Sequence, residues 1–449
     1  MSTPTQPSGP TAGEVLARRD VRHVVVLGAN GTMGYGSGAL FTRAVPKVTF
    51  LARTRSKAEQ GLHSAIRQVR SHTVEDRVEL GSYDADFDRV VADADLIFEA
   101  VTERLDIKHS IFERVDRVRR PDSIVATVTS GLSINSLAAP HSDSFRRNFV
   151  GLHFFNPANV IVGTELIPGE ETDPEVVEWV DAFSTKRLGR EMVHTADRPG
   201  FAGNRVGFKV LNEVVQLAEE HGPWLMDNLI GRYTGRALAP LATIDLVGWD
   251  IHAAIVDNIW ANCPEDEVRD TLKMPEYMGD YIDDGVLGNK VGQGFFKRDG
   301  KRRLALDPAT GDYVPVDRLD MPDLGFIGTV ADLHRVGRYR DAMAAFANAE
   351  GPFAALARKV IAGYIAYSFN RVGEVTQTIA GIDRIMGFGF NWAPPSVLVD
   401  TLGPDATVAM IEEAGLAVPE ALRRALRDAG DGRLFTVPHV DTGKFFIAA

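Results

Sequence analysis

A histidine and a glutamate in the stretch from Gly151 to Pro168, GLHFFNPANVIVGTELIP, have the types and the spacing of a catalytic pair. His153 opens a tight HFFNP segment, and Glu165 ends the apolar run that follows it. A strand that returns from this turn would bring the carboxylate to the imidazole. A carboxylate bonded to one ring nitrogen fixes the tautomer and raises the basicity of the other nitrogen, as a general base requires. The alternative is a histidine that only packs in the core beside aromatic residues.

A second group of residues is typical of a nucleotide site. The β-branched run at 21–27, VRHVVVL, leads directly into GANGTMG at 28–34. Glycines let the backbone approach a pyrophosphate, and the first turn of a following helix offers unpaired N–H groups and a positive dipole. The spacing is GxxGxxG, one residue longer than the tighter GxGxxG form. The candidate cofactor-binding residues in this turn are Gly28, Asn30, Gly31, Thr32, Met33 and Gly34.

The end of the second expected strand bears on which dinucleotide binds. An acidic residue at this place normally accepts hydrogen bonds from the adenosine ribose. The chain has LARTRSK here, with Ala52 where the acid is expected and Arg53 next to it. The missing carboxylate removes a ribose acceptor and a repulsive charge, while guanidinium groups suit a 2′-phosphate. These residues favour NADP over NAD. The alternatives are that Arg53 belongs to a solvated loop and NAD binds more weakly, or that no dinucleotide binds.

The elements that must position these residues alternate between strand and helix. Residues 35–45 are expected to form a helix, and strands are expected at 47–51, 95–101, 123–128 and 149–155. This alternation predicts an α/β fold, a Rossmann-like doubly wound parallel sheet, with its ligand at the carboxyl ends of the strands.

Five motifs, in order along the chain, carry a resemblance to a known family. They are DADLIFEAVTERLDIKHSIF (93–112), TSGLSI (129–134), GLHFFNPANV (151–160), DRPGFAGNRV (197–206) and LGNKVGQGFF (287–296). From about Arg22 to the C-terminus the chain resembles the 3-hydroxyacyl-CoA dehydrogenases. The resemblance is to the long bacterial form, which has two tandem C-terminal helical domains, here without an enoyl-CoA hydratase domain.

The resemblance implies roles for the matching residues. His153 corresponds to the catalytic base and Glu165 to the carboxylate that orients it. Ser130 and Asn204 correspond to the residues that bond the substrate oxygen. Further active-site positions of the family, assigned here to the cofactor side, fall on Glu103, Lys108 and Asn156. One departure is Val128, where the family usually has an asparagine near the nicotinamide.

The implied reaction interconverts a 3-hydroxyacyl thioester and its 3-ketoacyl form by hydride transfer to or from a nicotinamide cofactor. The resemblance favours NAD, the usual cofactor of the family, whereas the residues near Arg53 favour NADP. CoA is the expected carrier of the acyl chain. The alternatives are a biosynthetic dehydrogenase for a carrier-protein-bound or unusual acyl thioester, and a non-catalytic dinucleotide sensor or structural protein, since fold alone does not determine function.

After Pro199 the sequence becomes helical, and one pattern occurs twice. Its proline lies five residues before an aspartate, which lies three residues before a glycine, in both copies. The matched positions are Asp227, Pro240, Asp245 and Gly248 in the first copy, and Asp383, Pro395, Asp400 and Gly403 in the second. We therefore expect an all-α part made of two duplicated helical domains.

The expected organisation has five parts. They are a disordered leader at 1–20, a dinucleotide-binding domain at 21–198, the first helical C-terminal domain at 199–300, a linker at 301–345, and the second helical copy at 346–449. In single-copy relatives the helical domain mediates a homodimer, and a second copy would occupy that surface within one chain. The resemblance thus leaves monomer and homodimer open.

The composition narrows the class of protein. A net charge of −12 argues against nucleic acid as the main partner. The single cysteine, Cys263, excludes an intramolecular disulfide and fits a reducing compartment. No run approaches the roughly 18 apolar residues that span a bilayer, and no metal-ligand spacing such as HExxH occurs. We expect a cytoplasmic protein with no membrane partner and no metal.

Overall fold

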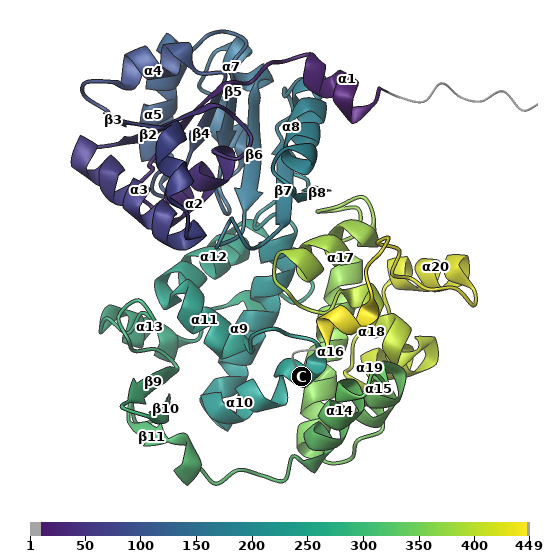
Figure 1. Cartoon of the computed structure of the whole chain (residues 1–449). Helices are drawn as coiled ribbons and strands as arrows, with labels where there is room; N and C mark the ends of the chain where they lie inside the picture. Colours follow the sequence, from purple (N-terminus) through teal and green to yellow (C-terminus); the bar gives the residue numbers. More distant parts are fainter. Residues whose placement is uncertain (1–9, 447–449) are drawn as a thin grey trace, which may run out of the picture. The chain divides into compact units, whose positions relative to one another are not determined.

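The computed structural model of the chain describes residues 10–446, which fall into two compact units (Figure 1). The first unit ends at Asp197 and the second begins at Arg198. This break lies one residue before the expected end of the dinucleotide-binding domain. The first unit contains a large sheet, and the second is mostly helical.

Eight strands form the sheet of the first unit, in the order β3-β2-β1-β4-β5-β6-β7-β8. Their bounds are β1 His23–Leu27, β2 Lys47–Ala52, β3 Val78–Ser82, β4 Leu96–Glu99, β5 Ile124–Thr127, β6 Phe149–Phe154, β7 Gly163–Pro168 and β8 Glu191–His194. The pairs from β3 to β6 are parallel, and β1, β4, β5 and β6 are buried at every position, as in a sheet covered on both faces. The strand order reverses between β1 and β4, so the ligand crevice of such a sheet lies at the carboxyl ends of these strands. The expected Rossmann-like fold is confirmed.

The end of the sheet departs from an all-parallel arrangement. β7 runs antiparallel to β6, and β8 runs parallel to β7. The helices of this unit are α1 Ala12–Ala17, α2 Thr32–Phe41, α3 Arg55–Val69, α4 Phe87–Asp93, α5 Leu105–Val118, α6 Ile134–Ala138, α7 Asp143–Arg147 and α8 Pro174–Lys186. Because β7 runs antiparallel to β6, it is the return strand expected after the HFFNP turn, and the two strands form a hairpin.

The leader expected to be disordered over residues 1–20 is folded in its second half. Thr11 and Glu14 form a capping box at the start of α1, in which each side chain bonds the backbone N–H of the other residue. Val15 is buried against the hydrophobic core, and Arg18 pairs with Glu178 of α8 at 2.9 Å. The capping box is a sequence signature of a helix start, which the Pro- and Gly-rich composition obscured. The first nine residues of this expectation lie outside the described residues.

The second unit contains two groups of helices joined by a small sheet. Its helices are α9 Gly203–His221, α10 Pro223–Leu229, α11 Pro240–Val247, α12 Trp249–Asn262, α13 Glu276–Asp283, α14 Gly325–Arg335, α15 Tyr339–Ala347, α16 Pro352–Asn370, α17 Ile379–Phe388, α18 Pro395–Leu402, α19 Pro404–Glu413 and α20 Glu420–Ala429. Its three strands are β9 Phe296–Asp299, β10 Arg302–Leu306 and β11 Tyr313–Pro315. Among residues 10–446, no helix has the length and apolarity needed to cross a bilayer, and no group of three His, Cys, Asp or Glu side chains is placed to hold a metal ion.

The segment expected as a linker, residues 301–345, is a folded part of this unit. It contains two strands of the small sheet and helices α14 and α15. Val330 and Ala342 of these helices are fully buried. The turn-rich motifs that suggested a linker are the connections between these elements.

The repeated aspartates make the same contacts in both helical copies. Asp227 accepts a hydrogen bond from Leu241 N at the start of α11, and Asp383 accepts one from Ser396 N at the start of α18. The second pair of aspartates, Asp245 and Asp400, each accepts from two consecutive backbone N–H groups farther along the chain, those of Phe295 and Phe296 and of Leu434 and Phe435, respectively. These matched contacts support the interpretation that one helical domain occurs twice.

The buried aspartates predict a dependence of stability on pH. Burial raises the pKa of Asp383 to about 7 from its ordinary value of 3.8. Between about pH 4 and pH 7 the folded chain keeps a proton that the unfolded chain releases, so this group makes folding less favourable as the pH rises. We expect Asp383→Asn, which keeps an acceptor for Ser396 N, to raise Tm relative to wild type more at pH 7.5 than at pH 4.5. The difference corresponds to roughly 2 to 4 kcal/mol.

The control for this test is Asp405→Asn, which removes an exposed carboxylate from α19. Thermal unfolding followed by circular dichroism at both pH values measures the effect. A Tm difference between Asp383→Asn and wild type that is the same at pH 4.5 and pH 7.5 would contradict the prediction.

Candidate active site

The hairpin of β6 and β7 places His153 directly opposite Glu165. Glu165 is fully buried and His153 is 5% exposed, and Nδ1 of the ring lies 2.6 Å from Oε2 of the carboxylate. A carboxylate at Nδ1 holds the proton on that nitrogen, so the basic lone pair is on Nε2. The ring of Phe155 packs against the imidazole at 4.8 Å between centroids. The pair predicted from the sequence is therefore formed, in a geometry suited to proton transfer.

Residues of four parallel strands reach the same edge of the sheet. The glycine turn follows β1, Glu103 and Lys108 follow β4, Ser130 follows β5, and His153 is the second-to-last residue of β6. Carboxyl ends of parallel strands meet at one edge, so these predicted residues share one side of the unit. Asn156 follows β6 in the loop that leads to β7 and is exposed.

A buried ion pair underlies this edge. Glu99, the last residue of β4, is fully buried, and both of its carboxylate oxygens accept from Nζ of Lys108 at 2.8 Å. The hydroxyl of Thr127 and the backbone N–H of Val101 donate to the same carboxylate. Lys108 is thus held by a carboxylate that the sequence motifs did not single out. A charged residue inside the apolar run DLIFEAV was the available signal, because such a residue is rarely buried without a partner.

Glu103 organises the loop that carries Ser130. Its Oε1 accepts from the hydroxyl of Thr129 at 2.5 Å and from the backbone N–H of Ser130 at 2.7 Å. Its Oε2 lies 3.3 Å from Nζ of Lys108. Val128, just before this loop, is buried, and its N–H donates to the carbonyl of Glu99. The contacts of Glu103 connect the segments after β4 and β5.

The glycine turn fits the pyrophosphate of a dinucleotide. Gly28 has φ +77°, and a Cβ there would lie 2.4 Å from the carbonyl oxygen of Ala100. A Cβ on Gly34 would lie 2.2 Å from the carbonyl oxygen of Gly28. Helix α2 begins after Gly31 without a side-chain cap, so its first N–H groups can bond an anion. The remaining predicted residues of the turn are Asn30, Thr32 and Met33, the first two exposed and the third partly buried.

The end of β2 presents alanine and arginine where an acid was expected, and a tyrosine from the end of β3 lies near the glycine turn. Ala52 is buried, and Arg53 is exposed and makes no hydrogen bond or ion pair with any residue in the described range 10–446. The hydroxyl of Tyr83 accepts from the N–H of Gly28 at 2.9 Å. Burial raises the pKa of Tyr83 to about 12, so the phenol keeps its proton. The sequence offered no signal for Tyr83, because it reaches the turn from the end of β3.

Asn204 belongs to the second unit. It lies in the first turn of α9 and is buried. Its predicted place beside His153 stays a prediction.

Comparison with known proteins identifies the family. The family model described as the NAD-binding domain of 3-hydroxyacyl-CoA dehydrogenase matches residues 23–198, and the model of its C-terminal domain matches residues 200–298. A probable 3-hydroxyacyl-CoA dehydrogenase of Bacillus subtilis is 32% identical over 79% of the chain and 45% of its own length. A probable 3-hydroxybutyryl-CoA dehydrogenase of Deinococcus radiodurans is 30% identical over 46% of the chain and 72% of its own length.

A solved structure shares the fold. The 3-hydroxybutyryl-CoA dehydrogenase of Escherichia coli superposes with a TM-score of 0.69 at 22% identity, over 92% of this chain and all of that one. The chain spans between 45% and 64% of the length of the first curated relatives it matches. From the two matching domain models and the relatives above, the chain belongs to the 3-hydroxyacyl-CoA dehydrogenase family.

Proposed function

We propose that this chain is an oxidoreductase that interconverts a 3-hydroxyacyl thioester and its 3-ketoacyl form with a nicotinamide cofactor. The observation that carries the proposal is the buried pair of His153 and Glu165, which lies at the same edge of the sheet as the glycine turn. A general base and a dinucleotide cradle at one edge are the two requirements of hydride transfer from a hydroxyl-bearing carbon.

His153 moves the proton in this scheme. In the oxidative direction Nε2 takes the proton of the substrate 3-hydroxyl, and in the reductive direction the protonated ring returns it to the ketone oxygen. The carboxylate of Glu165 holds the ring in one tautomer and stabilises the imidazolium. Because Glu165 is fully buried, its negative charge acts on the imidazole with little screening by water.

Ser130 and Asn204 bond the substrate oxygen on which charge changes during the reaction. The contact between Glu103 and Ser130 N supports this role, because it holds the serine backbone in one place. The ion pair of Lys108 with Glu99 holds the first turn of α5 against the end of β4, on the cofactor side of the proposed site. When bound, the nicotinamide ring supplies the atom that accepts or delivers hydride.

We infer that NADP is the preferred cofactor. Ala52 removes the carboxylate that would accept from a ribose hydroxyl, and the exposed Arg53 offers a guanidinium to a 2′-phosphate. Tyr83 does not discriminate between the two cofactors. Its hydroxyl, whose oxygen accepts from Gly28 N, has an O–H that can donate to a ribose or a phosphate oxygen.

The substrate carrier is CoA in this proposal, as the names of the two curated relatives indicate for those proteins. A pantetheine arm on a carrier protein presents the same thioester. The second helical copy leaves monomer and homodimer open as the assembly.

The first prediction of this proposal concerns the catalytic pair. With acetoacetyl-CoA and NADPH or NADH, His153→Ala should lower kcat by about 10²- to 10⁴-fold, because the ketone oxygen loses its proton donor. Glu165→Gln should lower kcat as well, because an amide does not stabilise the imidazolium. Steady-state oxidation of the reduced cofactor, followed by its absorbance, measures both variants.

His63→Ala removes an exposed histidine of α3 and serves as the control, with a rate equal to that of wild type. An unchanged rate in His153→Ala would refute the mechanism. If wild type is inactive on the CoA ester with either cofactor but active on the corresponding carrier-protein thioester, the carrier is a protein and not CoA. The proposed proton and hydride transfers would then stand unchanged.

The second prediction tests the cofactor. Arg53→Ala should weaken NADPH binding by about 1 to 3 kcal/mol, the range of a charge-assisted contact, and leave NADH binding nearly unchanged. Titration of the intrinsic fluorescence with each cofactor gives the two dissociation constants. Arg22→Ala, which removes an arginine just before β1, controls for the change in net charge. Equal weakening of NADPH and NADH in Arg53→Ala would rule out a 2′-phosphate contact.

A further inference from the structure

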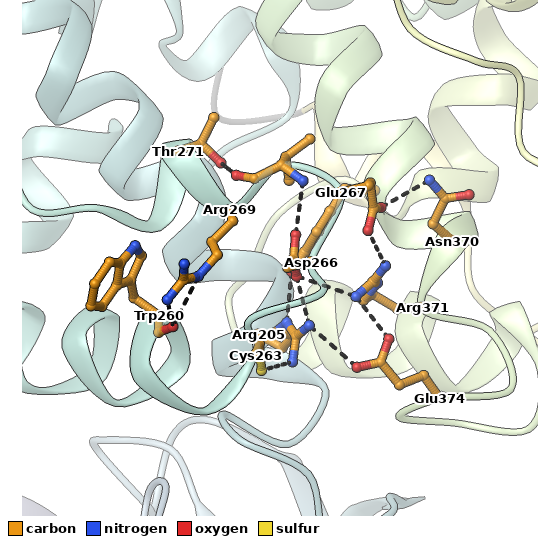
Figure 2. Close-up of polar contacts among 12 residues, drawn as sticks. Arg205, Trp260, Cys263, Asp266, Glu267, Arg269, Thr271, Asn370, Arg371 and Glu374 are labelled. Carbon is orange, nitrogen blue, oxygen red and sulfur yellow. Dashed lines mark hydrogen bonds and ion pairs between the residues drawn. The ribbon is translucent and has the colours of Figure 1, made fainter.

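A cluster of charged and polar side chains joins the start of α9 to the second helical copy (Figure 2). We call it the Arg205 cluster, and its members are Arg205, Cys263, Asp266, Glu267, Tyr367, Arg371 and Glu374. Arg205 lies on α9 and the next three members follow α12, all in the first copy, whereas the last three lie at or just after the end of α16 in the second.

Arg205 is the centre of the cluster and is 1% exposed. Its Nη2 donates to Oδ2 of Asp266 at 2.6 Å, and its Nε donates to the hydroxyl of Tyr367 at 2.7 Å. Its Nη1 donates to Sγ of Cys263. Burial by itself lowers the pKa of the guanidinium, but Tyr367, Cys263 and Glu374 hold that pKa above its usual value. Arg205 is therefore charged, and its position is determined by several directed contacts.

The second copy supplies much of what holds Arg205. The hydroxyl of Tyr367 accepts from Arg205 and donates to Asp266 at 2.7 Å, so one phenol bridges the two partners of an ion pair. Glu374 lies 3.2 Å from Nη2 of Arg205 and 2.7 Å from Nη1 of Arg371. Arg371 also pairs with Asp266 at 3.3 Å. Loss of one of these groups leaves buried charge with too few partners.

The start of α9 does not hold itself in place by local interactions alone. Gly200 and Phe201 precede the helix with φ of +75° and +50°, and the latter is unfavourable for a residue with a side chain. A strained entry persists only when the surrounding contacts determine it. Arg205, in the first turn, supplies such contacts.

Asn204 lies in this same turn, directly before Arg205. We infer that the second helical copy positions Asn204 for the reaction through the Arg205 cluster, with Tyr367 and Glu374 as positioning residues. The inference rests on the proposed function, in which Asn204 bonds the substrate oxygen. It gives the second copy a part in the chemistry that needs no contact between its own side chains and the substrate.

Tyr367→Phe is the sharpest test, because it removes only the bridging hydroxyl and keeps the ring. We expect kcat for acetoacetyl-CoA to fall about tenfold, because catalysis is sensitive to small displacements of a substrate-positioning group. The dissociation constant of the cofactor should stay within about twofold of wild type, because the glycine turn belongs to the first unit. The substitution should also preserve the packing of Arg371, whose guanidinium lies 4.6 Å from the centre of the same aromatic ring.

A double-mutant cycle separates positioning from general damage. In an Asn204→Ala background, Tyr367→Phe should cause no further loss of kcat, because the group through which it acts is gone. Hydrogen exchange of the peptide covering 200–208 adds a readout independent of activity. Exchange there should be faster in Tyr367→Phe than in wild type.

Arg269→Ala is the matched control. Arg269 stacks on Trp260 at 4.2 Å near the cluster but does not join it (Figure 2). This variant should keep the wild-type kcat and the wild-type exchange at 200–208. If Tyr367→Phe unfolds, Glu374→Gln, which removes one partly exposed carboxylate, takes its place with the same expected results.

Three outcomes would overturn the inference. They are an unchanged kcat in the folded variant, an equal loss of kcat with and without Asn204, and unchanged exchange at 200–208. Failure of the proposed function itself has a different signature, since wild type would then be inactive or Asn204→Ala fully active, while the exchange result would still report on the cluster.

Discussion

A charge withdrawn from water must be paired, and this constraint organises the functional parts of the molecule. Glu165 is fully buried against His153, Glu99 is fully buried against Lys108, and the carboxylate of Asp266 is buried against Arg205. In each case the partners come from different elements, so the elements are held in one arrangement by the need to satisfy the charge. In the proposed function, the pair with histidine also orients the group that transfers the proton.

The sheet of the first unit brings the pairs of Glu165 with His153 and of Glu99 with Lys108 to one edge. Since β1, β4, β5 and β6 are parallel, the glycine turn, Lys108, Ser130 and His153 all lie at or after the carboxyl ends of strands on the same side of the sheet. The switch from parallel to antiparallel at β7 then brings Glu165 back beside His153. A parallel partner for β6 would have needed a crossover connection, and the short segment at 155–162 has too few residues for one.

The second unit extends the same principle to a repeated domain. Matched aspartates hold the helix starts and returning loops in both copies, so the two copies share one internal plan. The two copies contribute different groups to the start of α9. The first copy supplies the helix with its strained entry, and the second supplies hydroxyl and charged groups that complete the surroundings of Arg205.

The sequence by itself determined the class of the fold, the family, and the partners in the His153 and Glu165 pair, because strand periodicity, glycine spacing and ordered motifs are local properties. It also indicated the repeat, through equal spacing of aspartate, proline and glycine. Tertiary structure alone decided that residues 301–345 fold, that Tyr83 reaches Gly28, and that Glu99 neutralises Lys108. The contacts of Arg205 with Tyr367 join residues 162 positions apart. Such contacts depend on which elements pack together, and local sequence patterns do not determine this packing.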